Sequence, residues 1–167
     1  MKVFLATDHA GYKLKEEVKN FLIDLGYDVM DCGAYTYDPE DDYPDFISLA
    51  AKGVSEDLSA KAIIFGGSGQ AEAIAANKYP NVRAVVFYSA QAPIGEADIQ
   101  GRKSDDPYEM IRLTREHNDA NILSLGARFI STPQAKEVIK LWLETLFSNS
   151  PRHQRRIDKI MKLEKYV

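Results

Sequence analysis

Two kinds of apolar segment alternate along this chain of 167 residues. Short segments rich in apolar residues, which are typical of strands, occupy residues 3–6, 27–31, 62–65, 83–87 and 121–125. Longer segments with apolar residues at helical spacing lie at residues 11–25, 44–54, 73–76, 108–116, 133–147 and 157–163. Continuous apolar strands that alternate with amphipathic helices indicate a parallel sheet covered on both faces. The chain is therefore predicted to form a single Rossmann-like, three-layer α/β/α domain over residues 1–167, with a five-stranded parallel sheet.

A glycine-rich turn, Gly66-Gly67-Ser68-Gly69, joins the third predicted strand to the next helix. In open α/β sheets, ligands bind in the crevice at the carboxyl ends of the strands, and a helix N-terminus favours negative charge. The Ser68 hydroxyl and the Glu72 carboxylate lie about one helical turn apart. Donors for an oxyanion next to a candidate base indicate proton transfer beside a carbonyl group. Two simpler interpretations remain open. In one, the glycines serve only to make the turn tight, as in many strand-to-helix turns. In the other, Glu72 only stabilises its helix, because an acidic residue in the first turn interacts favourably with the helix dipole.

The three histidines of the chain are His9, His117 and His153. His9 follows the first predicted strand, His117 lies in the predicted turn before the fifth strand, and His153 lies in a basic C-terminal segment. Short amide and acid side chains flank His117 and are able to fix its tautomer. A single loop histidine is usually incidental, but the placement of all three favours a role in a site.

The formal net charge of −4 is distributed unevenly. Residues 151–167 hold six Lys or Arg and only two acidic residues, so the remainder of the chain is strongly acidic. A compact basic segment on an acidic body favours a small anion as ligand, because nucleic acid requires a broader basic face. A solvated helix with cations near its C-terminus explains the lysines equally well. It explains Arg152, Arg155 and Arg156 less well, since they lie near the start of the segment.

The only cysteine, Cys32, excludes an intrachain disulfide and fits a reducing cytoplasm. Its place at the end of a predicted strand favours a small buried residue over a reactive thiol. No apolar stretch approaches the roughly 20 residues needed to cross a bilayer. Asp8 interrupts the apolar run at the N-terminus, which argues against a signal peptide. We therefore expect a soluble cytoplasmic protein that binds neither membrane nor nucleic acid.

Eight segments, taken together and in order, resemble the type B ribose-5-phosphate isomerases, a family that also contains galactose-6-phosphate and allose-6-phosphate isomerases. They are 7–11 (TDHAG), 42–44 (DYP), 66–69 (GGSG), 74–78 (IAANK), 83–84 (RA), 116–121 (EHNDAN), 126–128 (GAR) and 152–154 (RHQ). The resemblance extends from residue 2 to about residue 160, except for one insertion. Several ordered motifs are far more specific than any one of them alone.

The resemblance implies an aldose–ketose isomerase of the pentose phosphate pathway that uses no metal and no organic cofactor. Such an enzyme moves a proton between carbons 2 and 1 of an open-chain sugar phosphate through an enediol(ate). Members of the family use as base either a cysteine at the first position of the glycine turn or a glutamate six residues later. Gly66 occupies the first of these positions in this chain, so Glu72 is the matching base.

The other site residues also follow from the resemblance. Ser68 and the backbone of the turn would hold the enediolate oxygen, and His117, with Asp8 nearby, would open the sugar ring. His9, Arg128, Arg152 and Arg156 resemble the residues that bind the phosphate. The remaining residues expected to contact the substrate are Tyr43, Gly67, Gly69 and Asn118.

The resemblance further implies a homodimer or a tetramer, with the site shared between subunits and the C-terminal helix extending to the partner. Ribose 5-phosphate is the expected substrate, and a six-carbon sugar phosphate is the alternative. A non-catalytic sugar-phosphate sensor would need neither Glu72 nor His117. A flavodoxin-like module that binds FMN would share the layered fold but would require aromatic residues beside the flavin.

Two features depart from the family pattern. Ala71 stands where the family commonly has glycine, and its extra methyl group is expected to narrow the pocket. The segment of residues 90–107 is longer than the family usually has. Long connections of this kind are typically lids or spacers, so we expect a mobile cover over the sugar or a contact with the partner subunit. A tolerated surface loop is the simpler alternative, because long insertions add little entropic cost.

Overall fold

The computed structural model describes residues 1–164 of the chain. Its five strands are β1 (Lys2–Ala6), β2 (Asp28–Asp31), β3 (Lys61–Gly66), β4 (Ala84–Phe87) and β5 (Ile122–Gly126). They form one parallel sheet in the order β2-β1-β3-β5-β4. The predicted five-stranded parallel sheet is confirmed, and each strand lies within one residue of its predicted bounds. Lys165, part of the basic segment noted above, lies outside the described residues.

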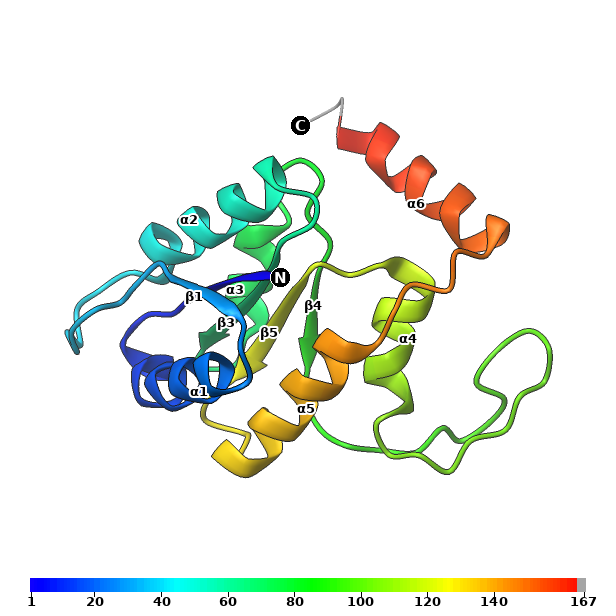
Figure 1. Cartoon of the computed structure of the whole chain (residues 1–167), viewed down its shortest axis with the longest axis horizontal. Coiled ribbons are helices and arrows are strands. Elements are labelled where there is room, and N and C mark those ends of the chain that lie inside the picture. Colours follow the sequence, from blue (N-terminus) through cyan, green and yellow to red (C-terminus); the bar gives the residue numbers. More distant parts are fainter. Residues whose placement is uncertain (165–167) are drawn as a thin grey trace.

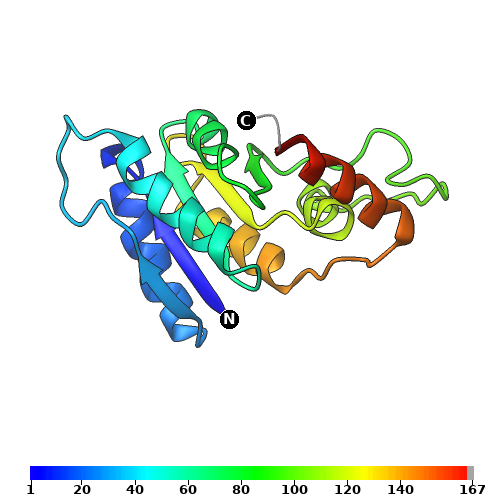
Figure 2. The same ribbon diagram turned by 90° about the horizontal axis from the view of Figure 1, so that it is seen from above.

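Helices cover both faces of this sheet (Figures 1 and 2). They are the short 3₁₀ helix η1 (His9–Gly11) and the α-helices α1 (Tyr12–Asp24), α2 (Tyr43–Glu56), α3 (Gln70–Ala76), α4 (Glu109–Asn118), α5 (Thr132–Glu144) and α6 (Pro151–Leu163). Helices α1, α4 and α5 bury their apolar sides on one face, around the fully buried Trp142. Helices α2 and α3 cover the other face, around Ile47, Ala50 and Ile64. Helix α6 packs on α4 and lies away from the sheet (Figure 1).

Several helix ends differ from the predicted ranges, and those of α4 and α5 bear on the candidate site residues. Helix α4 extends to Asn118 and ends at Asp119, which adopts a left-handed conformation with φ of 43°. His117 and Asn118 therefore lie in the last turn of a helix and not in a loop. Helix α5 ends at Glu144, three residues earlier than predicted, because the chain leaves it in an extended conformation at Thr145. The segment after α5 runs toward α4, where the Ser148 N–H donates to the Glu116 carbonyl at 3.1 Å.

The order of the strands creates a crevice at the carboxyl edge of the sheet. The chain leaves β1 through α1 on one face and leaves the adjacent β3 through α3 on the other face. Divergent connections of this kind open the space in which α/β proteins bind ligands. The segments that follow β1, β3 and β5 meet at this edge, whereas the end of α4 leads into the amino end of β5 at the opposite edge.

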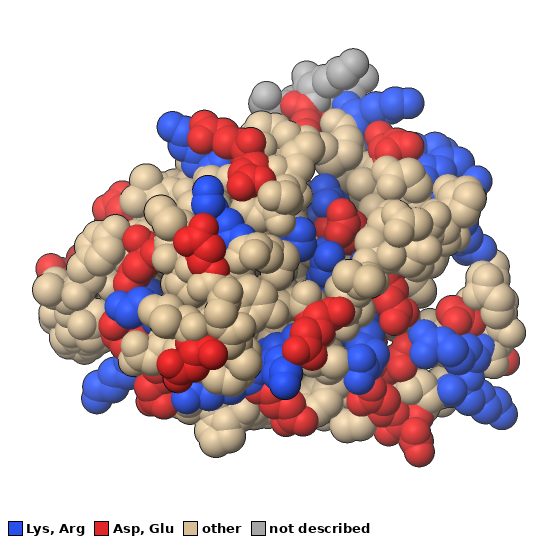
Figure 3. All heavy atoms as spheres, viewed as in Figure 1, with Lys and Arg blue, Asp and Glu red and all other residues tan. Residues whose placement is uncertain are grey.

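Two further expectations are tested by the structure. Cys32 is half-buried, and burial raises the pKa of its thiol to about 11, as expected for a packed and not a reactive cysteine. Among the described residues, the helices are all too short or too polar to cross a bilayer. Basic and acidic side chains are interspersed over most of the surface in Figure 3, with Lys and Arg gathered over α6 at the upper right.

Candidate active site

The turn after β3 places the Glu72 carboxylate in a space that a side chain at position 66 would fill. A Cβ built on Gly66 would overlap this carboxylate, so Glu72 fits only because residue 66 is glycine. Gly69, with φ of +77°, is the residue from which α3 begins. The first turn of α3 then directs Glu72 back toward the end of β3.

The environment of Glu72 suits a base. The residue is only 4% exposed, and its Oε2 atom has no hydrogen-bond partner within residues 1–164. Burial raises the pKa of this carboxyl group, a hydrogen bond from its own backbone lowers it, and the charge of Asp8 raises it again. Burial thus outweighs the stabilisation that a helix N-terminus gives to a carboxylate. A buried carboxylate with a raised pKa and an unused oxygen is able to take a proton from a substrate.

The crevice at the carboxyl edge contains a cavity of about 400 Å³. Its lining consists of Asp8, His9, Ala10, Gly67, Ser68, Glu72, Arg128 and Phe129. Asp8 caps η1 by accepting the Ala10 N–H at 2.9 Å, and the Arg128 guanidinium lies against Gly67. The Thr7 hydroxyl donates across to the carbonyl of Phe65 at 3.1 Å, which ties the ends of β1 and β3 together. A carboxylate, a hydroxyl, an imidazole and a guanidinium therefore converge on one cavity.

A second cluster of predicted site residues surrounds another cavity, of about 230 Å³. His117, Arg152, His153 and Arg156 line it together with residues 97–100 of the long segment. The rings of His117 and His153 lie 4.1 Å apart between centroids. Burial, and then the neighbouring His153, lower the pKa of His117, so its imidazole is mainly neutral near pH 7. Arg152 and Arg156 form no ion pair with any residue of the range 1–164, which leaves both guanidinium groups for an anion.

Two arginines, the partly buried Arg83 and the buried Arg115, fix the end of α4 next to His117. Arg83 donates to the carbonyls of Asn118 and Asp119 at 2.9 and 2.7 Å. Arg115 donates to the Asp119 carboxylate at 2.7 Å. These contacts satisfy the carbonyl groups that the end of a helix leaves without partners. The RA motif at 83–84 therefore supports the site without lining it.

The structure separates residues that the sequence analysis placed together. His117 lies in the last turn of α4, at the amino edge of the sheet, and Asp8 follows β1 at the carboxyl edge. Asp8 and His117 therefore do not lie near each other within one chain, and the expected pairing would require two subunits. The predicted phosphate-binding residues divide in the same way, with His9 and Arg128 in one cavity and Arg152 and Arg156 in the other. The cause is the direction of α4, which runs back along the sheet from the carboxyl edge before β5 begins.

Several predicted substrate contacts line neither cavity. Tyr43 begins α2 and packs against the core on that face. The Gly69 carbonyl accepts the Ser124 hydroxyl at 2.6 Å, and the Asn118 carbonyl accepts from Arg83. Ala71 also lies outside both cavities, so its methyl group does not narrow them. A larger cavity of about 480 Å³, between α4 and the end of α5, contains none of the predicted site residues.

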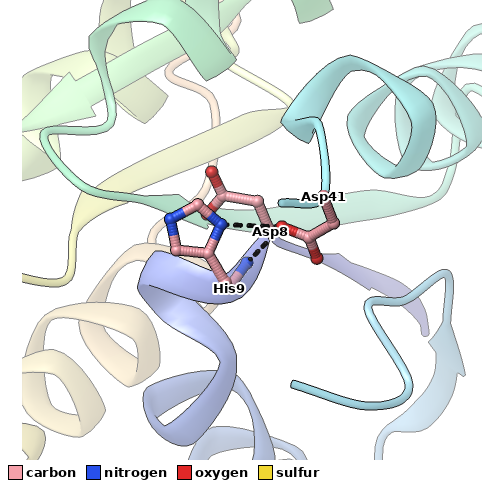
Figure 4. Close-up of side chains that lie close together, drawn as sticks. All are labelled: Asp8, His9 and Asp41. Atoms are coloured by element: carbon pink, nitrogen blue, oxygen red, sulfur yellow. Dashed lines mark hydrogen bonds and ion pairs between the residues drawn. The ribbon is translucent and has the colours of Figure 1, made fainter. Parts of the chain in front are cut away.

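Sequence reasoning missed Asp41. Its side chain, in the loop that leads into α2, forms a hydrogen bond with the His9 ring at 2.7 Å (Figure 4). The two residues are 32 positions apart, and nothing in the local sequence distinguishes Asp41 from the acidic residues beside it. The only signal was its position directly before the DYP motif at 42–44.

The fold and these two clusters define an α/β enzyme that moves protons on a small anionic substrate. A family comparison narrows this class. The family model described as Ribose/Galactose Isomerase matches residues 3–94 and 105–160, and the chain belongs to this family. The two matched segments leave residues 95–104, within the long connection, between them.

Individual relatives agree with the family match. The chain is 36% identical over 165 residues to ribose-5-phosphate isomerase B of Mycolicibacterium paratuberculosis, covering 99% of this chain and 92% of the relative. It is 31% identical to the Escherichia coli protein of the same name, covering 98% and 96%. The crystal structure of ribose-5-phosphate isomerase B from Mycoplasma genitalium, with bound ribulose 5-phosphate, superimposes with a TM-score of 0.85. It is 32% identical to this chain, with 99% and 97% of the two chains covered.

Proposed function

We propose that this protein interconverts ribose 5-phosphate and ribulose 5-phosphate through an enediol(ate). The observation that carries the proposal is the buried Glu72 carboxylate, which has a raised pKa and faces a cavity shared with Ser68 and Arg128. In the reaction, Glu72 takes the proton from carbon 2 of the open-chain aldose and returns it to carbon 1. A proton also passes from the oxygen on carbon 2 to the oxygen on carbon 1, so atoms and charge balance.

The relatives named above support ribose 5-phosphate as the substrate. The direct test is an assay of the purified protein on a panel of five- and six-carbon aldose phosphates, with the ketose product identified. Exchange of the carbon-2 proton with solvent deuterium would report the enediol step separately. Release of a six-carbon ketose phosphate at a higher kcat/KM would assign the substrate to the alternative class.

The remaining residues have distinct roles in this proposal. Ser68 and the backbone of the glycine turn bind the enediolate oxygen. The mainly neutral imidazole of His117 is suited to taking the ring hydroxyl proton as the sugar opens. His9, Arg128, Arg152 and Arg156 bind the phosphate, where charge-assisted hydrogen bonds are strongest. The reaction as proposed needs neither metal nor organic cofactor, and the protein acts in the cytoplasm.

The division of the site into two clusters supports a site shared between subunits. In one chain, Glu72 and His117 lie at opposite edges of the sheet, so one substrate meets both only if a second chain contributes its His117 cluster. Helix α6, which lies away from the sheet, is suited to carry Arg152 and Arg156 toward a partner (Figure 2). We therefore propose a homodimer, or a tetramer built from such dimers, with two shared sites in each dimer.

Mixing two inactive variants tests this arrangement. Glu72→Gln and His117→Ala each disable both sites of a pure dimer, because every site needs one residue from each chain. After co-expression or joint refolding, half of the dimers contain both variants, and each of these has one intact site. We expect the mixture to recover about a quarter of wild-type activity by random pairing of equivalent chains. Activity no greater than the sum of the separate variants, with mixed dimers shown by mass spectrometry, would assign each site to a single chain.

We also propose that the long segment of residues 90–107 limits the size of the sugar. Residues 97–100 form a wall of the His117 cavity, and Arg102 binds them in place. Its guanidinium contacts Asp98 at 3.0 Å and the buried Glu109 at 2.6 Å, and Ser104 donates to the same Glu109 carboxylate at 2.8 Å. These contacts favour a fixed wall over a mobile cover.

Removing the wall should broaden the substrate range. The variant to be tested replaces residues 91–106 with a short Gly/Ser link. It also carries Glu109→Gln, because the buried Glu109 carboxylate would otherwise lose its partners. We expect kcat/KM for six-carbon relative to five-carbon aldose phosphates to rise about tenfold, since misfit of one small group is worth about 1–3 kcal/mol. Lys103→Ala, within the segment but outside the cavity, is the control. An unchanged ratio in a variant that still folds and oligomerises would show that the segment is a tolerated surface loop.

A further inference from the structure

Asp41 holds both the main chain and the ring of His9 through one carboxylate oxygen. Its Oδ1 atom accepts the backbone N–H of His9 at 2.9 Å and lies 2.7 Å from the ring Nδ1 (Figure 4). Only 9% of the Asp41 side chain is exposed. Because a carboxylate offers no proton, the ring must carry its proton on Nδ1 to make this bond. The second ring nitrogen then faces away from Asp41 (Figure 4).

This arrangement decides what His9 offers to an anion. A neutral ring with its proton on Nδ1 presents a lone pair at Nε2, which repels a phosphate oxygen. The protonated ring presents an N–H donor and a positive charge at the same position. Since Asp41 fixes the proton on Nδ1, His9 binds an anion through Nε2 only as the imidazolium.

The charged groups around His9 favour that form on balance. The hydrogen bond to Asp41 is the largest influence and raises the pKa of the ring. Partial desolvation lowers this pKa, the charges of Asp8 and Asp41 raise it, and Arg128, from the segment after β5, lowers it. The net direction is upward from the ordinary value of about 6.5. The imidazolium therefore persists to higher pH than that of a free histidine.

The position of Asp41 is not explained by a contribution to the stability of the folded protein. Its second oxygen, Oδ2, is buried and has no hydrogen-bond partner within residues 1–164. A buried polar atom without a partner lowers stability and requires an explanation. The contacts of the other oxygen supply one, since both of them are to His9, a lining residue of the catalytic cavity.

We propose that Asp41 is a positioning residue that holds His9 as an imidazolium, with its Nε2–H donor directed at the phosphate of the substrate. This inference rests on the proposed function only in naming the anion as the substrate's phosphate. The hold of Asp41 on the His9 ring is testable without any isomerase activity.

The experiment compares Asp41→Asn with the wild-type protein across pH. Nitrogen-15 NMR of the histidine rings, with and without inorganic phosphate, should show the His9 pKa falling toward about 6.5 in the variant. The ratio of kcat/KM between wild type and variant should be near one at pH 6, where both rings are charged. It should rise with pH, to about tenfold, over the range in which the variant ring has lost its proton and the wild-type ring still keeps its charge-assisted bond. Glu72 and the substrate's phosphate also titrate, but they affect kcat/KM of the wild type and of the variant alike. Their contributions to the pH dependence therefore cancel in the ratio.

Two further variants make the result specific. Glu40→Gln removes one charge from the adjacent, exposed position of the same loop and should change neither the His9 pKa nor the ratio. Asp41→Glu keeps the negative charge, so its His9 pKa and its kcat/KM at high pH should lie between those of the wild type and of Asp41→Asn. An unchanged His9 pKa in Asp41→Asn would contradict the proposal that Asp41 keeps the ring protonated. A fall of the His9 pKa in Glu40→Gln as large as in Asp41→Asn would also contradict it. A lowered pKa with a ratio independent of pH overturns the role of the imidazolium in binding phosphate. Absence of isomerase activity in the wild type would contradict the proposed function and leave the NMR test of Asp41 intact.

Discussion

Replacing Glu72 with glutamine should lower kcat by about 10²–10⁴-fold, with little change in KM. Glutamine keeps the shape of the side chain and removes the group that accepts the carbon-bound proton. KM should change little because the carboxylate acts on the proton in the transition state, while the phosphate contacts hold the substrate. The measurement is steady-state kinetics of ribose 5-phosphate isomerisation, with loss of solvent deuterium exchange at carbon 2 as a second readout.

The folded state of this variant needs its own control. The glutamine N–H₂ would be buried where the Glu72 Oε2 atom has no partner, so a small loss of thermal stability is expected. Binding of inorganic phosphate, followed by NMR, should be retained because the phosphate-binding residues are untouched. A variant that keeps near wild-type kcat would show that Glu72 is structural and that another group takes the proton.

Removing either Arg152 or Arg156 should lower kcat/KM by about 10- to 100-fold, since each charge-assisted bond to a phosphate is worth about 1.5–3 kcal/mol. The structure supports this expectation because both side chains line the His117 cavity and neither is occupied by an ion pair within residues 1–164. Alanine at either position removes the guanidinium. The effect should disappear with a sugar that lacks the phosphate group.

Arg155 provides a matched control on the same helix. It lies between the two arginines in sequence, is exposed and does not line the cavity. Arg155→Ala removes the same charge from α6 and should leave kcat/KM within about twofold, as expected for an exposed surface substitution. Equal losses on phosphorylated and unphosphorylated sugars would instead mean that Arg152 and Arg156 stabilise the fold or the subunit interface.

The central strands β3 and β5 were predictable because each is fully buried and therefore consists mainly of apolar residues. The edge strand β2, in contrast, alternates between exposed and partly buried residues. Helix ends were harder, since they depend on single residues whose conformation the sequence does not announce. Asp119 ends α4 in the left-handed region, a position more often taken by glycine. Without glycine as a signal, His117 was assigned to a loop although it lies in the last turn of a helix.

The candidate site residues likewise differed in how far the local sequence could predict them. Ser68 and Glu72 were predictable as a unit because they share one short turn, and His9 because it directly follows a strand. The pairing of Asp41 with His9 was not predictable, since the two residues are 32 positions apart and the whole of α1 and β2 lies between them. The separation of His117 from Asp8 depends on the direction of α4 and the position of β5 between β3 and β4, which no local pattern specifies.

The overlap between a side chain at position 66 and the Glu72 carboxylate also constrains how this family is able to diverge. Relatives with a cysteine at the first position of the turn need a different residue, or a different rotamer, six positions later. A side chain at position 66 would displace the Glu72 carboxylate from the place that it occupies in this protein. The residue at one position therefore constrains the conformation that is available to the side chain at the other.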